Sequence, residues 1–168
     1  IYAAMAKAGV IEKMKKMGIK WIFIGSVDNA LLNMVDPILV GLTIDQKHEI
    51  ASKSVAKANP HERVGVFCKI NSVPSVIEYS ELPEEMAEET DKDGELLYGE
   101  AHIMCNLFSI DALEKVSKVK LPYHVAVKKS GYMDENLEFI EAGEPNAYKF
   151  EAFIFDAFNF FDDISILR

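Results

Sequence analysis

Cysteine is scarce in this sequence: Cys68 and Cys105 are the only two among 168 residues, and each stands inside an apolar run. Two isolated thiols make no disulfide framework, which excludes the small disulfide-stabilised secreted domains and favours a reducing, cytoplasmic compartment. No apolar stretch reaches the roughly 18 residues of a membrane span, and the N-terminus has no basic-then-apolar signal pattern. The composition predicts a soluble, cytoplasmic protein.

Basic residues are also in short supply. Eighteen Lys and Arg stand against 27 Asp and Glu, a formal net charge of −9, and the basic residues do not cluster along the chain. Such a protein repels polyanions, so we expect no nucleic-acid partner. A small phosphorylated ligand stays possible, because a metal ion and a few local donors can bind phosphate in an acidic protein.

Several catalytic signatures are missing. The chain has no Walker loop, no Gly-x-Gly-x-x-Gly turn and no Gly-x-Ser-x-Gly elbow, which argues against a self-contained phosphate cradle and against a serine hydrolase. With 49% hydrophobic and 27% charged residues, the chain has the composition of a globular protein. It shows no repeat and no interdomain linker. We therefore interpret residues 1–168 as part of one mixed α/β domain.

The hydrophobic pattern predicts a helix from Ile1 to Met17 that Gly18 ends, and no residue ahead of Ile1 can cap it. The apolar run Ile19–Ile24 predicts a strand buried on both faces of a parallel sheet. Further strands are expected at Ala51–Lys57, Val64–Ile70, Ser75–Tyr79, Ala101–Phe108, Leu137–Ile140 and Ile164–Leu167. Further helices are expected from Thr43 through Ile50, after Pro83, over Ile110–Val119 and, rich in aromatic residues, over Phe150–Phe161. Of these, the helix over Ile110–Val119 is capped by Ser109 and stopped at Leu121-Pro122.

Three residues are candidates for ligand contact. Asp28 follows the first strand, where a carboxylate can ligate Mg²⁺, although aspartate is also an ordinary turn residue that can cap the next helix. Glu78 can accept hydrogen bonds from two sugar hydroxyls, or face solvent on an alternating strand. Gly65 allows a ligand to approach the backbone, or marks a bulge.

Six phenylalanines between residues 150 and 161 can wall a pocket, although core packing also accounts for them. Asp156 lies among these rings. A carboxylate there is costly to bury unless it is paired or bound to metal, so Asp156 is a surface residue or a second metal ligand. The pair Lys128-Lys129 can meet phosphate or form a solvated face.

Taken in order and spacing, a set of short segments resembles the central part of UDP-N-acetylglucosamine pyrophosphorylases, over essentially the whole chain. The segments are Ile1-Tyr2, Val27-Asp28-Asn29, Val35-Asp36-Pro37, Val64-Gly65-Val66, Ile77-Glu78-Tyr79-Ser80-Glu81, Tyr123-His124-Val125-Ala126-Val127-Lys128-Lys129 and Lys149-Phe150-Glu151-Ala152-Phe153-Ile154-Phe155-Asp156.

The resemblance implies a nucleotidyltransferase α/β fold, Rossmann-like and of the SpsA/GT-A type, with a mixed sheet and flanking helices. It implies a uridylyltransferase that uses Mg²⁺ to convert UTP and N-acetylglucosamine 1-phosphate to UDP-N-acetylglucosamine and pyrophosphate. A UDP-glucose, UDP-galactose or broad-specificity UDP-sugar pyrophosphorylase, or a non-catalytic sugar-nucleotide-binding module, is the alternative.

Carried over by position, Asp28 matches the family's catalytic aspartate beside nucleotide and metal, and Tyr2 the tyrosine after the family's Asn-Gly-Gly turn. Asp156 falls where related nucleotidyltransferases place a second metal ligand. These matches make Asp28 and Asp156 the expected metal ligands.

On the sugar side, Gly65 matches the glycine whose backbone meets the sugar, and Glu78 the glutamate that accepts sugar hydroxyls. Phe153 and Phe155 match the aromatic pair on the acetamido side. His102 stands where the family has an asparagine near the N-acetyl group, which puts sugar selectivity in question because imidazole cannot donate and accept in an amide's geometry.

The family's glycine-rich loop, uridine-binding segment and phosphate-binding lysine have no counterpart in these residues. We therefore expect an incomplete fragment, the central part of a single nucleotidyltransferase catalytic domain, with negligible turnover by itself.

Overall fold

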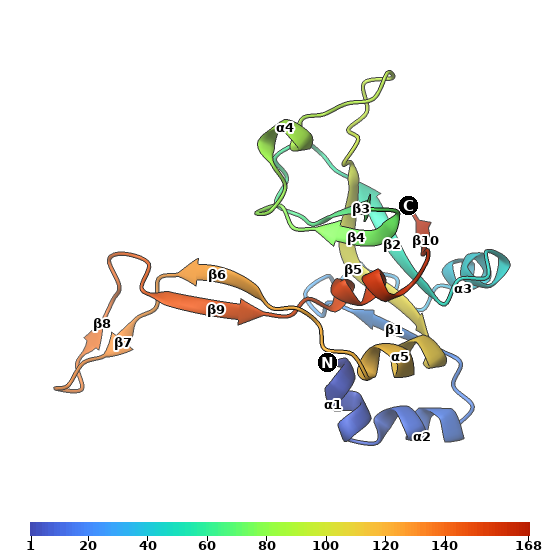
Figure 1. The fold of residues 1–168 in the computed structure, drawn as a ribbon, viewed down its shortest axis with the longest axis horizontal. Coiled ribbons are helices and arrows are strands. Elements are labelled where there is room, and N and C mark those ends of the chain that lie inside the picture. The colour runs from blue at the N-terminus through green and yellow to red at the C-terminus, as the bar shows by residue number, and fades with distance from the viewer.

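The structure is a computed structural model that describes residues 1–168. Its centre is a mixed sheet, which Figure 1 shows with helices packed around it. The six strands of this sheet are β1 (Trp21–Gly25), β2 (Ile50–Ala56), β3 (Val66–Ile70), β4 (Val73–Ile77), β5 (Glu100–Ser109) and β10 (Ser165–Leu167). They follow the order β10-β2-β5-β3-β4, and β1 pairs with β5 as well. The expected mixed sheet with flanking helices is confirmed.

The direction predicted for the first strand is wrong. β1 pairs antiparallel with the second half of β5, from Trp21 opposite Ser109 to Gly25 opposite Cys105, and its residues are half-buried. Among the pairs of this sheet, β10 and β2 are the ones that run parallel. An apolar run identifies a buried strand but carries no information on the direction of a partner strand, which here lies 80 to 88 positions away in the sequence, from Gly25–Cys105 to Trp21–Ser109.

A bulge divides β5 at the point where β1 ends. The register with β2 shifts between Ser52 and Ser54, and Met104 has a φ of 56°, a left-handed value that is uncommon outside glycine. The Met104 carbonyl accepts a hydrogen bond from the Ser26 backbone N–H at 3.2 Å. The chain after β1 is therefore fixed to the bulge, and bulges often lie beside functional sites.

The N-terminal helix is broken in two. Helix α1 (Tyr2–Lys7) and helix α2 (Val10–Lys16) are separated at Gly9, whose φ is 67°. The prediction of one continuous helix was wrong because its apolar period runs through this glycine. Gly18 has a φ of 77° beyond the second helix, consistent with the predicted end.

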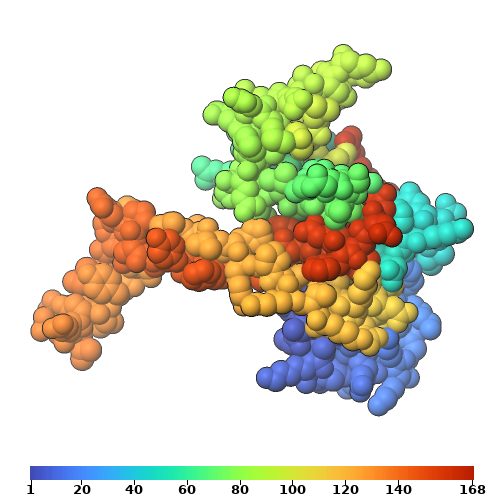
Figure 2. Space-filling model, viewed as in Figure 1, coloured from blue at the N-terminus to red at the C-terminus, as the bar shows by residue number.

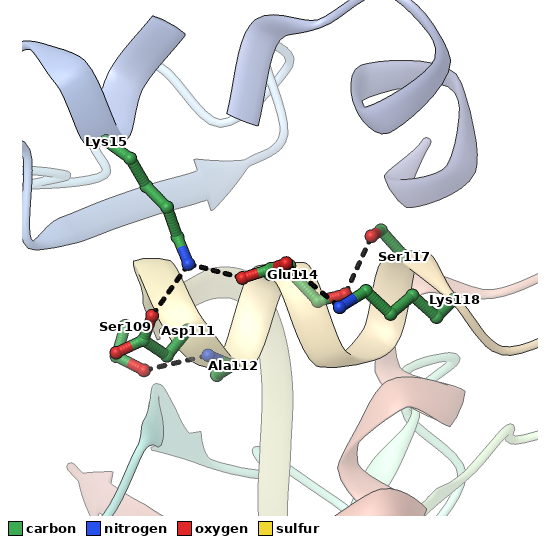
Figure 3. A network of polar contacts seen from close by, with 7 residues as sticks. All are labelled: Lys15, Ser109, Asp111, Ala112, Glu114, Ser117 and Lys118. Atoms are coloured by element: carbon green, nitrogen blue, oxygen red, sulfur yellow. Dashed lines mark hydrogen bonds and ion pairs between the residues drawn. The ribbon is translucent and has the colours of Figure 1, made fainter. Parts of the chain in front are cut away.

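Helix α5 (Ile110–Ser117) begins as predicted, since the Ser109 hydroxyl accepts a hydrogen bond from the Ala112 backbone N–H at 3.0 Å. It ends before the predicted stop. Figure 3 shows how α2 is fastened to it: Lys15 forms ion pairs with Asp111 and Glu114, and Glu114 also binds Lys118 at 2.9 Å.

Helix α3 (Pro37–Asp45) starts earlier than the helix predicted from Thr43. Asp36 caps it by accepting a hydrogen bond from the Ile38 backbone N–H at 2.9 Å, and Asp36 also pairs with Lys53 of β2 at 2.5 Å. Thr43 lies inside the helix, where its hydroxyl donates to the Leu39 carbonyl. The residues that mark the start of this helix are therefore Asp36 and Pro37, an N-cap aspartate followed by a proline in the first helical position, and not Thr43.

The predicted strands at β2, β3, β4, β5 and β10 are confirmed, as is the short helix after Pro83, α4 (Glu84–Ala87). The hairpin between β3 and β4 turns at Asn71 and Ser72, both with positive φ, as a two-residue loop requires. The aromatic segment is a 3-10 helix, η1 (Ile154–Phe160), rather than an α-helix from residue 150. Its Phe155 and Phe158 enter the main hydrophobic core.

A long arm was not predicted. It consists of the antiparallel pair β6 (His124–Lys128) and β9 (Ala147–Glu151) and, beyond them, the short strands β7 (Tyr132–Met133) and β8 (Phe139–Ile140). The predicted strand at Leu137–Ile140 is its β8. Figures 1 and 2 show the arm projecting from the rest of the molecule.

No helix in the chain has the length and apolarity that crossing a membrane would take. Both cysteines are free thiols, with Cys105 buried and Cys68 partly buried, and burial raises the pKa of each.

Candidate functional site

A cleft of about 480 Å³ lies between the segment that follows β4 and the base of the arm. Both walls carry polar side chains: the first contributes the carboxylates of Glu78 and Glu81, and the second contributes His124 and Lys128. The second wall also carries the aromatic ring of Phe153. The lining residues are Glu78, Tyr79, Ser80, Glu81, His124, Val125, Ala126, Val127, Lys128, Glu151 and Phe153.

Gly65 and Glu78 are neighbours across the β3–β4 hairpin. A Cβ atom added at Gly65 would lie 3.2 Å from Oε1 of Glu78 and 2.9 Å from Cγ1 of Val76. Gly65 is buried, and its carbonyl accepts a hydrogen bond from the His102 backbone N–H at 2.8 Å. The absence of a side chain at Gly65 thus leaves the Glu78 carboxylate against bare backbone.

The predicted aromatic pair forms one stack. The rings of Phe153 and Phe155 lie 4.9 Å apart at 19°. Phe153 lines the cleft, whereas Phe155 is 4% exposed and presents its ring to the edge of His102 at 5.4 Å. The stack therefore connects the cleft with the core of the sheet.

His102 lies in that core and is 5% exposed. Its Nε2 is 3.0 Å from Oδ1 of Asn106, and its ring packs edge-on against Phe67 and Phe158 as well as Phe155. Burial lowers the pKa of His102, although the hydrogen bond to Asn106 opposes the change. Histidine here is a neutral core residue behind the aromatic stack.

His124 at the start of β6 joins two carboxylates. Its Nδ1 lies 3.0 Å from Oε1 of Glu81, and its Nε2 lies 3.1 Å from Oδ2 and 3.3 Å from Oδ1 of Asp156. The ring also packs against Phe153 at 4.6 Å. Three segments that are far apart in the sequence meet at this one side chain.

The titration of the cleft follows from this arrangement. Burial raises the pKa of Glu78, and the charges of Glu81, Glu151 and Asp156 add to the effect while His124 opposes it. Burial likewise raises the pKa of Asp156, against the charge of His124. Burial by itself would lower the pKa of His124, but the hydrogen bond to Glu81 and the charge of Asp156 outweigh it and raise that pKa.

Tyr2 lies beneath the site and is 2% exposed. Its hydroxyl donates a 2.8 Å hydrogen bond to the Ile154 carbonyl in η1, and its ring packs on Phe108. Burial and the nearby charge of Asp156 raise the pKa of Tyr2. The geometry gives Tyr2 a supporting position under η1.

Asp28 is exposed in the turn after β1. Its backbone N–H donates to the Ser26 hydroxyl at 3.2 Å, and its carboxylate makes no hydrogen bond or ion pair within the chain. No contact joins it to Glu78 or to the aromatic stack. The structure thus brings most of the predicted site residues together and leaves Asp28 apart. The roles of these residues stay predictions.

Sequence reasoning missed His124 and Glu81. Both stand in segments that the family resemblance highlighted, but their meeting joins residues 43 positions apart, which no local pattern reveals. One signal was available: His124 opens an alternating strand directly after the Leu121-Pro122 break, where a polar ring has no helical or core role.

An acidic cleft with an aromatic wall, set against a mixed α/β sheet, is suited to a polyhydroxylated ligand rather than to nucleophilic catalysis, because carboxylates accept hydroxyl hydrogen bonds and ring faces pack on sugars. The fold is the one found in solved structures of UDP-sugar pyrophosphorylases. The chain belongs to the family described as UTP–glucose-1-phosphate uridylyltransferase, whose model matches residues 1–161.

Individual relatives agree with this assignment. The chain is 37% identical over 163 residues to mouse UDP-N-acetylhexosamine pyrophosphorylase-like protein 1, covering 95% of this chain and 32% of that protein. It is 36% identical over 163 residues to UDP-N-acetylglucosamine pyrophosphorylase of Saccharomyces cerevisiae, covering 95% and 34%. A crystal structure from Entamoeba histolytica, provisionally assigned as a UDP-N-acetylglucosamine pyrophosphorylase, superimposes with a TM-score of 0.87 at 36% identity over 98% of this chain and 41% of that chain. The chain thus spans about a third of the length of the curated relatives it matches.

Proposed function

We propose that this chain supplies the sugar-binding part of a UDP-N-acetylglucosamine pyrophosphorylase, a uridylyltransferase that makes UDP-N-acetylglucosamine and pyrophosphate from UTP and N-acetylglucosamine 1-phosphate. The proposal covers a longer polypeptide, since the matched relatives extend well beyond the aligned region. By itself the chain is expected to have negligible turnover.

One observation carries the proposal: the Glu78 carboxylate lies against the bare backbone of Gly65 in a cleft that Phe153 also lines. A carboxylate can accept hydrogen bonds from two adjacent sugar hydroxyls. The absence of a Cβ at Gly65 lets the Glu78 carboxylate lie against the backbone at the cleft, and the Phe153 face can pack on an acetamido methyl group.

In the proposed reaction, an oxygen of the sugar 1-phosphate attacks the α-phosphorus of UTP in line. The new oxygen–phosphorus bond forms as the bond to the bridging β-phosphate oxygen breaks, and pyrophosphate leaves. Little covalent chemistry falls to the protein, so catalysis rests on positioning and on stabilising phosphate charge. Within this chain, Glu78 and Phe153 would orient the sugar end of the attacking group.

Mg²⁺ fits at Asp28. Its carboxylate is exposed and unpaired, and Mg²⁺ commonly takes one or two carboxylates together with substrate phosphates and water. When bound, the ion would neutralise charge that develops on the phosphates. Asp156 could act as the second ligand only after turning away from His124, which contacts both of its oxygens.

The position of His102 favours a second candidate, a UDP-sugar pyrophosphorylase of broader sugar choice. Because His102 is buried and bonded to Asn106, it cannot provide an amide's paired contacts to an N-acetyl group, and it would affect sugar choice through Phe155. A cytoplasmic location belongs to the same proposal, since free thiols suit a reducing compartment.

The test is an assay of the full-length protein with UTP, Mg²⁺ and a panel of sugar 1-phosphates, following pyrophosphate release. We expect the highest kcat/KM with N-acetylglucosamine 1-phosphate. Comparable values with glucose or galactose 1-phosphate would favour the broader enzyme. Tight binding of UDP-sugars without any turnover would replace the enzyme with a non-catalytic binding module.

A further inference from the structure

We propose that His124 is a positioning residue for sugar binding: it ties the base of the arm to the segment after β4 and to η1, and so fixes Glu78 and Phe153 relative to each other. The proposal rests on the proposed function, because it concerns the same cleft. It assigns a role to a side chain that acts through its neighbours rather than on the reacting atoms.

The first step is the geometry of the ring. Each nitrogen of His124 faces a carboxylate oxygen, Nδ1 toward Glu81 at 3.0 Å and Nε2 toward Asp156 at 3.1 Å. Both distances lie in the range of a hydrogen bond, so the two carboxylate groups hold the ring in one orientation.

The second step leads from His124 to Glu78. The backbone N–H groups of Glu81 and Leu82 both donate to the Glu78 carbonyl, at 2.9 and 3.0 Å, and form a tight turn. The Glu81 side chain is thereby held one turn away from Glu78. When His124 holds Glu81, it also limits the movement of the backbone that presents the Glu78 carboxylate to the cleft.

The third step leads from His124 to the aromatic wall. Asp156 follows Phe153 by three residues, so the contact between His124 and Asp156 restrains the segment that carries Phe153. The His124 ring also lies 4.6 Å from the Phe153 ring. Phe153 is therefore held by its contact with the His124 ring and by the stack with Phe155.

The fourth step concerns the arm. His124 and Glu151 are paired residues at its base, and the remaining strands point away from the sheet. The side chain of His124 is about a quarter exposed, whereas that of Asp156 is 8% exposed. The contact to Asp156 therefore anchors the first residue of the arm to the buried part of the molecule. Glu151 at the base and Lys128 further along the arm line the same cleft.

The experiment uses the full-length protein and compares His124→Gln with a matched control, His61→Gln. His61 is also paired with a glutamate, Glu88 at 3.3 Å, but is well exposed and does not line this cleft. A glutamine at position 124 cannot reach both carboxylates. We expect the KM for the sugar 1-phosphate to rise about 10-fold, the factor that about 1.4 kcal/mol represents, with the KM for UTP and kcat within about 2-fold of wild type.

Glu81→Gln and the double variant with His124→Gln complete the design. Glu81 is about half exposed, so its substitution is compatible with folding even if the histidine variant is not. If both residues act through one contact, the rise in sugar KM for the double variant falls short of the product of the single effects. A general structural loss would instead change kcat and both KM values together.

Unchanged sugar KM in His124→Gln, or in Glu81→Gln where the first variant does not fold, would overturn the inference while leaving the enzyme proposal intact. A wild-type protein that makes no UDP-sugar from any sugar 1-phosphate would instead sink the proposed function.

Discussion

Gly65 and Glu78 face each other so closely that a single methyl group at position 65 would lie 3.2 Å from the Glu78 carboxylate oxygen. Gly65→Ala should therefore displace Glu78 and Val76 and raise the KM for the sugar 1-phosphate by about tenfold, equivalent to roughly 1.4 kcal/mol. Steady-state kinetics of the full-length protein with each substrate varied in turn would show the change.

The control is Gly41→Ala. Gly41 lies in α3, where an added Cβ meets nothing within 4 Å, and alanine in a helix is favoured over glycine by roughly 0.5–1 kcal/mol. This variant should keep both KM values and gain a little stability. Equal effects of the two alanine variants would contradict the role given to Gly65.

Asp28→Asn tests the metal proposal. Replacing the carboxylate with an amide removes the charge that would bind Mg²⁺, so kcat should fall by about 10²-fold or more, and more Mg²⁺ should be needed for half-maximal rate. Asp45→Asn, an exposed substitution at the end of α3, is the control. Wild-type Mg²⁺ dependence in Asp28→Asn would remove Asp28 from the metal site.

Phe158→Ala should cost about 3–5 kcal/mol of unfolding free energy, as expected for a large aromatic lost from a core. Phe158 is completely buried and packs against Phe67, Phe108 and His102. Phe150→Ala, on the arm and 63% exposed, should change stability by less than about 0.5 kcal/mol. Urea unfolding of both variants measures the contrast, and similar losses would show that the arm, too, is a packed core.

The link between α2 and α5 should make stability depend on pH. Hydrogen bonds and charges from Lys15 and Lys118 lower the pKa of Glu114 from 4.5 to about 2. Because the folded pKa is the lower one, the stabilisation is complete above the unfolded value and is lost as pH falls from about 4.5 toward 2.

Glu114→Gln should therefore lose less stability than wild type over that pH range. The measurement is chemical unfolding at pH 5 and pH 3, with Glu12→Gln as a control because Glu12, in α2, forms no ion pair. A wild-type pH slope in Glu114→Gln would show that the network in Figure 3 contributes nothing in solution.

Local signals explain what the sequence predicted well. Ser109 predicts the start of α5 because its hydroxyl accepts a hydrogen bond from the backbone N–H of Ala112, only three residues along the chain. The strands that form the β3–β4 hairpin were also predicted, since the partners are adjacent in sequence, but the turn is shorter than expected: Val73 and Pro74 belong to β4 and only Asn71 and Ser72 remain in the loop. Such elements need no knowledge of the rest of the fold.

What could not be predicted depends on distant partners. The direction of β1 is set by pairing with β5, and the arm forms because β6 pairs with β9 across an intervening segment. In the site, Gly65, Glu78 and Phe153 were open candidates from their local sequence, and only the family resemblance assigned them a role in sugar binding. His124 was missed because its two carboxylate partners lie 43 and 32 residues away.

A crystal structure of the full-length protein with UDP-N-acetylglucosamine would test the central claim most directly. The account predicts a sugar hydroxyl within hydrogen-bond distance of the Glu78 carboxylate, about 2.7–3.1 Å, with the ring over Gly65 and the acetamido group against Phe153. A sugar bound elsewhere, with Glu78 still turned toward an empty cleft, would contradict it.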